Sequence, residues 1–121
     1  KNVEYVFLSV PVYSISVFIE LLNDNMFHRH LHGGHTHLYS KKSLHHIANE
    51  FEFDVAAEWW FGADMVDFYR SIYTNLKSKN VSNSFVDNFQ SMIIPLIDKM
   101  QVEIDKSEVA SEVHMLFKKK S

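Results

Sequence analysis

Residues 29–44 read R-H-L-H-G-G-H-T-H-L-Y-S-K-K-S-L, and the interpretation of the chain starts from this stretch. It contains four of the eight histidines and two of the three glycines, which stand side by side in its middle. Glycine tolerates positive φ and lets the backbone approach other groups closely. The glycine pair between histidines therefore predicts a tight loop that displays polar side chains. The histidines of the loop are His30, His32, His35 and His37, with His28 just before it and His45 and His46 just after it.

The loop is followed by a predicted helix over residues 40–49. Ser40 is a suitable N-cap because its hydroxyl can accept a hydrogen bond from the first turn. The apolar residues behind it keep helical spacing, which predicts one buried face: Leu44, Ile47, Ala48 and Phe51.

Three segments are predicted as β-strands. Residues 4–10 form a near-continuous apolar run, typical of a strand that is buried on both faces, and Pro11 ends it. Residues 53–61 form the second strand. Residues 112–118 alternate between apolar and polar side chains and form the third, with one predicted apolar face made of Val113, Met115 and Phe117.

The remaining segments have helical patterns. Residues 12–27 contain a short amphipathic helix with Ile15, Phe18, Ile19 and Leu22 on its apolar face. Residues 63–106 predict two further helices, and Pro95 is expected to kink or split the second. Glu58, Asp64 and Asp67 flank the end of the second predicted strand and could supply a carboxylate to the site. Asp64 and Asp67 are interpreted as solvated residues whose charge favours a helix N-terminus.

The composition narrows the class of protein. A chain of 121 residues that is 46% hydrophobic is one domain at most and has enough apolar side chains for a core. The net charge of -3 gives no basic field for nucleic acid. Without cysteine there are no disulfides, and no apolar run is long enough to span a bilayer. We expect a cytoplasmic protein that binds neither nucleic acid nor membrane.

Three segments resemble the back half of class I S-adenosylmethionine-dependent methyltransferases. Residues 7–11, F-L-S-V-P, are similar to the end of the family's fifth strand, which often reads S-x-P. Residues 34–44, G-H-T-H-L-Y-S-K-K-S-L, resemble the family's G-H-x-x-x-[YF]-[ST]-x-x-S-L segment before the sixth strand. Residues 51–55, F-E-F-D-V, are similar to the G-F-x-V entry into that strand, with Glu52 in the glycine position.

The resemblance implies an α/β fold that is the C-terminal portion of a Rossmann-like methyltransferase. Its three-stranded mixed sheet would hold the last strand antiparallel in the middle, and a helical insertion would be added. The chain would be a single partial domain. Residues 1–62 would supply strand, histidine loop, helix and strand, residues 63–107 the insertion, and residues 108–121 the final strand. The chain also starts inside a predicted strand without an initiator Met, so we expect it to be part of a longer protein.

The resemblance also implies a cofactor and an acceptor. These enzymes hold S-adenosylmethionine with a glycine-rich turn after the first strand and an acidic residue at the end of the second. Neither feature is found in this sequence, so we expect the donor to be bound by a missing N-terminal half. The chain itself would be inactive alone and would carry the site for a small-molecule acceptor.

The candidate site residues follow from the loop and the resemblance. His35 matches the family's motif histidine and is the predicted catalytic base, because a histidine near neutral pKa can take a proton from an acceptor. Arg29 is predicted to hold an anionic acceptor as a bidentate partner. Ligands in open α/β sheets bind beyond the carboxyl ends of the strands. The predicted substrate-binding residues of a cleft at that edge are Tyr13, Arg29, His30, His37, Tyr39 and Trp60.

Other interpretations stay open at this point. The alternating histidines have metal-ligand chemistry, and a histidine-rich metal-binding module is the alternative function. Trp59 and Trp60 suit core packing or an aromatic platform for a planar acceptor. The helix over residues 85–104 would serve as a dimer face if the chain were an interaction domain. The acceptor, the methylated atom and the oligomeric state are not indicated by the sequence.

Overall fold

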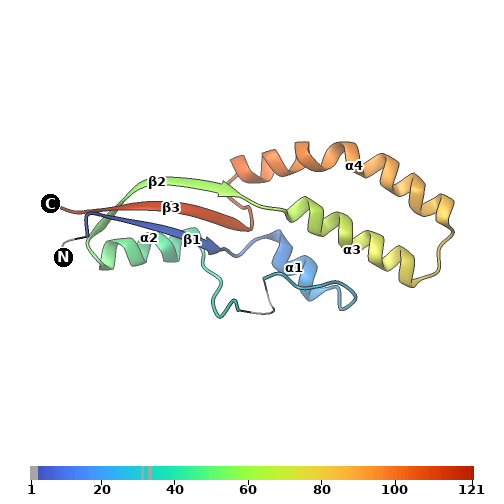
Figure 1. Ribbon diagram of the computed structural model, residues 1–121, viewed down its shortest axis with the longest axis horizontal. Helices are drawn as coiled ribbons and strands as arrows, with labels where there is room; N and C mark the ends of the chain where they lie inside the picture. The colour runs from blue at the N-terminus through green and yellow to red at the C-terminus, as the bar shows by residue number, and fades with distance from the viewer. Residues whose placement is uncertain (1–2, 31, 33) are drawn as a thin grey trace.

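The computed structural model describes residues 3–30, 32 and 34–121 and contains a three-stranded sheet with helices (Figure 1). In chain order the elements are β1 (Tyr5–Pro11), α1 (Ile15–Leu21), α2 (Lys41–Glu50), β2 (Phe53–Phe61), α3 (Asp64–Ser78), α4 (Asn83–Lys106) and β3 (Glu112–Lys119).

The sheet has the order β1-β3-β2, and β3 is antiparallel to both neighbours. Val113 of β3 lies opposite Val10 on one side and opposite Trp60 on the other. The predicted central position of the last strand is therefore confirmed. Both strand pairs of the sheet are antiparallel, which corrects the predicted mixed sheet, although β1 and β2 run in the same direction. The start of β1 and the end of β3 lie at the same end of the sheet, opposite the α3–α4 hairpin (Figure 1).

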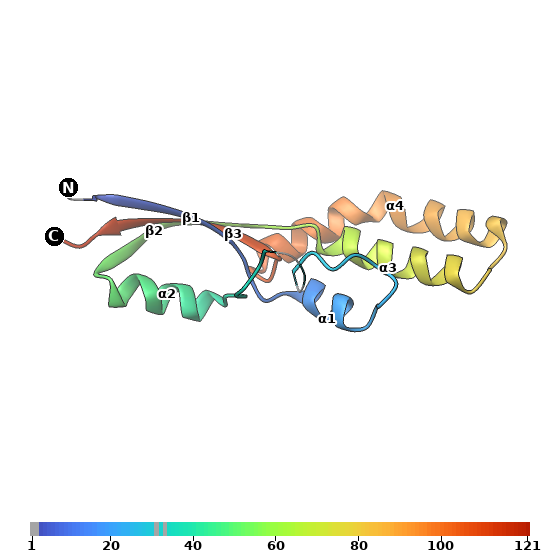
Figure 2. The same cartoon turned by 60° about the horizontal axis from the view of Figure 1, so that its bottom comes forward.

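Helix α2 covers one face of the sheet (Figure 2). Ser40 and Ser43 form a capping box at its start, so its first backbone N–H groups are satisfied. Leu44 and Ala48 are fully buried against the apolar face of β3. Phe51, which the helical spacing assigned to the buried face, is instead the exposed C-cap residue.

The opposite face of the sheet is open, which corrects the prediction that β1 is buried on both faces. No helix of the described residues lies over it in either view (Figures 1 and 2). Phe7 is 63% exposed and Trp59 is 66% exposed there. Alternating burial of this kind is typical of an antiparallel sheet with a single covered face.

Helix α1 is turned the opposite way from the prediction. Its apolar residues Ile15 and Phe18 are exposed, whereas Ser16, Val17 and Glu20 are buried. The buried polar face is possible because Ser16 and Glu20 both have hydrogen-bond partners in the interior.

Helices α3 and α4 form a long hairpin that extends away from the sheet (Figure 1). Tyr69 and Phe89 stack between them, with ring centroids 5.9 Å apart. α4 runs unbroken through Pro95, so the predicted split does not occur. Phe85 and Met92 are exposed on it, as the interaction-domain interpretation requires. Neither α4 nor any other described helix is long and apolar enough to cross a membrane.

Candidate functional site

The histidine loop returns to the carboxyl end of β1. The backbone N–H of Tyr13 donates to the Tyr39 carbonyl at 2.7 Å, and the N–H of Tyr39 donates to the Pro11 carbonyl at 3.4 Å. Val12 and Tyr39 form an isolated parallel bridge. These bonds close the loop over the edge where Pro11 ends the strand, which is where the sequence placed it.

A small cavity of about 180 Å³ lies at this edge. Three predicted site residues, Arg29, His30 and His35, reach it from the loop. Glu112, at the start of the central strand β3, closes its other side. The full lining consists of Ser9, Val10, Pro11, Arg29, His30, His35 and Glu112.

The other four predicted substrate-binding residues lie outside the lining of this cavity. Tyr13 is exposed and packs edge-on against Phe18, with ring centroids 5.3 Å apart. His37 is exposed and stacks on Tyr39, with centroids 6.2 Å apart. Trp60 is buried in the core beneath α2. Of the two tryptophans, Trp60 thus follows the core-packing interpretation.

His30 is the buried histidine of the loop, with 3% of its surface exposed. Its Nδ1 lies 2.9 Å from Oε1 of Glu20, which is itself fully buried in α1. Glu20 also accepts hydrogen bonds from the backbone N–H groups of Arg29 and His30, at 2.8 and 3.0 Å. The carboxylate thereby fixes both the start of the loop and the orientation of the imidazole.

His35, the predicted catalytic base, is exposed, and its Nδ1 donates to the Arg29 carbonyl at 3.0 Å. It therefore lines the cavity from the solvent side, and a backbone carbonyl orients its ring. His30 lines the same cavity from the interior, and a carboxylate orients its ring. Both histidines are therefore lining residues of one cavity.

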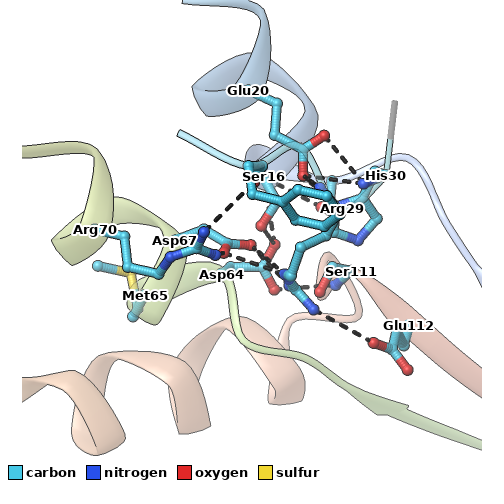
Figure 3. A network of polar contacts seen from close by, with 12 residues as sticks. Ser16, Glu20, Arg29, His30, Asp64, Met65, Asp67, Arg70, Ser111 and Glu112 are labelled. Atoms are coloured by element: carbon cyan, nitrogen blue, oxygen red, sulfur yellow. Dashed lines mark hydrogen bonds and ion pairs between the residues drawn. The ribbon is translucent and has the colours of Figure 1, made fainter. Parts of the chain in front are cut away.

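The guanidinium group of Arg29 lies between two carboxylates of the protein, those of Asp67 and Glu112 (Figure 3). Its Nε and Nη2 bind Asp67 at 3.1 and 2.7 Å, and its Nη1 lies 3.8 Å from Glu112. Arg70 also binds Asp67, at 3.1 Å. Partial burial by itself lowers the pKa of Arg29, but Asp67, Glu112 and Asp64 outweigh it and raise this pKa, so the guanidinium stays charged.

Asp64 joins four parts of the fold. Its Oδ1 accepts from Ser16 Oγ at 2.7 Å, and its Oδ2 accepts from the Ser111 backbone N–H at 3.0 Å and from Gln101 Nε2 at 3.3 Å. Both Asp64 and Asp67 are fully buried, which corrects their interpretation as solvated residues. Together they place α1, α4 and the start of β3 against α3, and so fix the wall of the cavity.

The pKa of Asp64 is lowered in the fold. Burial by itself raises this pKa, but hydrogen bonds from Ser16, Ser14, Gln101 and the Ser111 backbone together outweigh it. At the edge of the sheet, Glu58 behaves in the same way. Its partial burial raises the pKa, and hydrogen bonds from Trp60 and Lys41 lower it by more.

Both shifts predict that acid destabilises the protein. A carboxyl group with a lowered folded pKa stabilises the fold at pH values above its unfolded pKa, and loses this contribution as the pH falls through the folded pKa. The ordinary values are 3.8 for Asp64 and 4.5 for Glu58. We expect a constant urea midpoint above about pH 5 and a falling midpoint below about pH 4. The expectation fails if the midpoint rises as the pH falls through this range.

One group of described side chains has the composition of a metal site. Ligand atoms of Glu20, His30 and Asp67 all lie within 4.8 Å of one another. The exposed loop histidines His35 and His37 do not belong to this group. Arg29 already neutralises Asp67, so the group is balanced by an internal cation.

Two carboxylates of the network, Glu20 and Glu112, were not among the residues singled out from the sequence. Glu20 was not considered, although Ser16 and Glu20 are four residues apart and therefore share a face of α1. That spacing was a usable signal of a polar face. Which face of α1 is buried depends on contacts with Asp64 and the loop, far away in the sequence.

Comparisons of the chain with protein-family models, with curated proteins and with solved structures found no match. The geometry of the site and the resemblance of the segments quoted above are the features that bear on function.

Proposed function

We propose that the chain is the acceptor-side part of a class I methyltransferase, which moves a methyl group from S-adenosylmethionine to a small-molecule acceptor. The acceptor would lie in the cavity at the carboxyl end of β1. A Rossmann-like methyltransferase fold and a cytoplasmic location are parts of the same proposal.

The observation that supports it best is the return of the histidine loop to Pro11. This return brings Arg29, His30 and His35 into one cavity beside the central strand β3. Ligands of α/β folds bind at this edge of the sheet. The central antiparallel position of the last strand also agrees with what the resemblance implies.

The residues of this chain would contribute positioning and proton transfer. A bound sulfonium donor supplies the activated methyl group, so the remaining work is to orient the acceptor and to take its proton. His30 and His35 both line the cavity and have the side chain for that task. The hydrogen bonds of Arg29 to Asp67 and its ion pair with Glu112 would hold the walls of the cavity in place.

The experiment is a transfer assay with methyl-labelled S-adenosylmethionine and the protein at its natural length. A panel of small alcohols, phenols and amines would serve as acceptors. We expect label in at least one acceptor, and loss of this transfer when bulky side chains fill the cavity, as in Ser9→Trp. Transfer that is unchanged in Ser9→Trp would contradict the placement of the acceptor.

The 121 residues by themselves should not bind the donor. Gly62 is the glycine that lies between a strand and a helix, and a Cβ there would meet Asp64 Oδ2 at 2.5 Å. This glycine therefore serves internal packing and offers no open turn for a nucleotide. Isothermal calorimetry of the 121-residue chain with S-adenosylmethionine should show no heat of binding. Micromolar affinity would contradict the assignment of the donor site to other residues.

A metal-binding module is the second candidate, favoured by the proximity of Glu20, His30 and Asp67. Their carboxylates already accept hydrogen bonds from the loop backbone and from two arginines, which an ion would have to displace. A zinc titration separates the two functions. Stoichiometric uptake that is lost in His30→Ala would support the module, and uptake that is lost only in His35→Ala would place the metal in the loop.

A further inference from the structure

We infer that a second copy of the protein packs along the α3–α4 hairpin, antiparallel to the first and related to it by a twofold axis. The contact surface lies outside the cavity at β1, so its use is independent of the proposed methyl transfer. Three properties of the hairpin support this pairing: an exposed apolar stripe, a cavity beside the stripe, and an unequal distribution of charge along its length.

Helix α4 has an apolar stripe on its exposed surface, made of Phe85, Met92 and Leu96. These side chains are 57%, 68% and 45% exposed. Their spacing of seven and four residues places them on one side of the helix. A surface helix normally has a single apolar face, and in α4 that face packs on α3, where Phe89 stacks on Tyr69. The stripe is additional to the face that α3 covers, which is typical of an interaction surface.

The stripe borders a cavity of about 570 Å³ between the two helices. Ile72 and Leu76 of α3 and Phe89 of α4 line it together with Phe85 and Met92. Helices pack by inserting the side-chain ridge of one into the groove of the other. In a twofold pair each copy provides both a ridge and a groove, and the same surface is used on both sides. A second copy therefore fits this surface, because the stripe of each copy can fill the cavity of the other.

The two ends of the hairpin differ in charge. Its turn end, residues 73–83, lies farthest from the sheet (Figure 1) and contains two lysines and no acidic residue. Its sheet end, residues 98–108, contains four acidic and two basic residues. Lys77 and Lys79 at the turn end are exposed, and so are Asp98 and Glu103 at the sheet end.

These charges favour an antiparallel pair of copies. In this arrangement the turn end of each copy lies beside the sheet end of the other, so the lysines face an acidic segment. A parallel pair would bring the lysines of the two turn ends together. Glu103 forms an ion pair with Lys106 of its own helix at 2.9 Å, but both side chains are exposed, and such pairs contribute little to stability. Glu103 can therefore exchange this partner for a lysine of the second copy.

The first test measures the mass of the protein at its natural length by sedimentation equilibrium over a concentration series. We expect a dimer that dissociates on dilution. Met92→Glu should raise the dissociation constant at least about 30-fold, because a charge would be buried among apolar side chains at the centre of the interface. A monomer at every concentration, or a dimer that Met92→Glu leaves unchanged, would overturn the pairing.

Ile94→Glu is the matched control. Ile94 is 52% exposed and follows Met92 by two residues, so it lies about 200° around the helix and outside the stripe. This variant adds the same charge to α4 and should leave the dissociation constant unchanged. If Ile94→Glu weakens the dimer as much as Met92→Glu does, the stripe is not the interface.

The second test determines the direction of pairing without a charged variant. The 121 residues contain no cysteine, so Phe85→Cys and Leu96→Cys each introduce a single one into them. The stripe is centred between these two positions, so Phe85 of one copy lies beside Leu96 of the other in an antiparallel pair. Like positions would be separated by the length of the stripe, about 16 Å, whereas a disulfide needs Cα atoms within about 7 Å of each other.

A mixture of the two cysteine variants should therefore form disulfides between unlike copies at least about tenfold faster than between like copies. The unsubstituted protein gives the background of this measurement. Faster cross-linking of like copies, or no cross-link above the background, would overturn the antiparallel pairing.

The third test reverses the charges at the two ends of the hairpin. Lys77→Glu combined with Lys79→Glu should raise the dissociation constant about tenfold, because the twofold axis repeats each lost ion pair. Adding Asp98→Lys and Glu103→Lys should restore most of the affinity, since the two ends then attract each other with reversed signs. An unchanged dissociation constant in the first variant, or no restoration in the second, would show that these ends do not face each other and would overturn the pairing.

Discussion

Replacing Asp64 with Asn should lower the free energy of unfolding by about 3 kcal/mol, because hydrogen bonds to a charged group contribute about 1.5–3 kcal/mol each. Asp64 is fully buried and accepts from Ser16, Gln101 and the Ser111 backbone. Asn has the same size as Asp, but one carboxylate oxygen is replaced by an NH₂ group. This NH₂ group is a hydrogen-bond donor and would face other donors, so the hydrogen bonds on that side are lost. The measurement is the urea midpoint at pH 7.

A matched control is Asp98→Asn on the exposed side of α4. Surface substitutions usually change stability by less than about 0.5 kcal/mol, and we expect this one to do the same. The acid dependence gives a second readout. In Asp64→Asn the fall of the midpoint below about pH 4 should be smaller, because one carboxyl group with a lowered pKa is gone. An Asp64→Asn variant as stable as Asp98→Asn would show that the buried network contributes little.

The order of the elements could be predicted from local patterns. Residues 53–61 are rich in aromatic and apolar side chains and form β2 with the predicted bounds. The alternation in residues 112–118 placed Val113 and Met115 on one buried face. Such periodicities reflect which face of an element is covered, so they can be read without knowing the partner element.

The orientation of α1 could not be predicted in this way. Its apolar residues Ile15 and Phe18 have helical spacing and yet are exposed, whereas Ser16 and Glu20 are buried. A prediction from apolar periodicity assumes that the buried face of a helix consists of apolar side chains. Burial of a polar face becomes favourable only when distant groups supply every hydrogen bond.

The geometry of the candidate site could be derived from the sequence only in part. The glycine pair predicted the loop, and the proline at the end of the strand predicted the edge of β1 where the loop lies. Arg29, His30 and His35 line a cavity at this edge. The hydrogen-bond partners of these residues could not be predicted from the sequence. Asp67 lies 38 positions from Arg29 along the chain, and this separation carries no local signal.

Replacing Gly62 with Ala should destabilise the protein by about 2–3 kcal/mol, which is typical of overpacking in a rigid interior. A Cβ at this position would lie 2.5 Å from Asp64 Oδ2 and 2.9 Å from the Ser111 backbone N, and closer still to Ser111 Oγ. Asp64 cannot move away without losing its hydrogen bonds to Ser16 and Gln101. The urea midpoint of Gly62→Ala measures the cost.

Gly34 provides the control, since a Cβ there would meet nothing within 4 Å. Its φ lies outside the left-handed region, so an alanine fits the backbone, and this glycine is not needed for the bend predicted from the pair. Gly33, the other member of the pair, lies outside the described residues. Gly34→Ala should leave stability unchanged or raise it by up to about 1 kcal/mol, because alanine restricts the unfolded chain.

The double variant Gly62→Ala with Ser111→Ala identifies the contact that causes the loss. Ser111 Oγ is buried and has no hydrogen-bond partner among the described residues, so Ser111→Ala alone should cost little. Removing this oxygen takes away the closest contact of the new methyl group, while the contacts with Asp64 and the Ser111 backbone remain. The double variant should therefore recover about half of the lost stability. Full additivity of the two substitutions would show that the methyl group introduced by Gly62→Ala does not press on the Ser111 side chain.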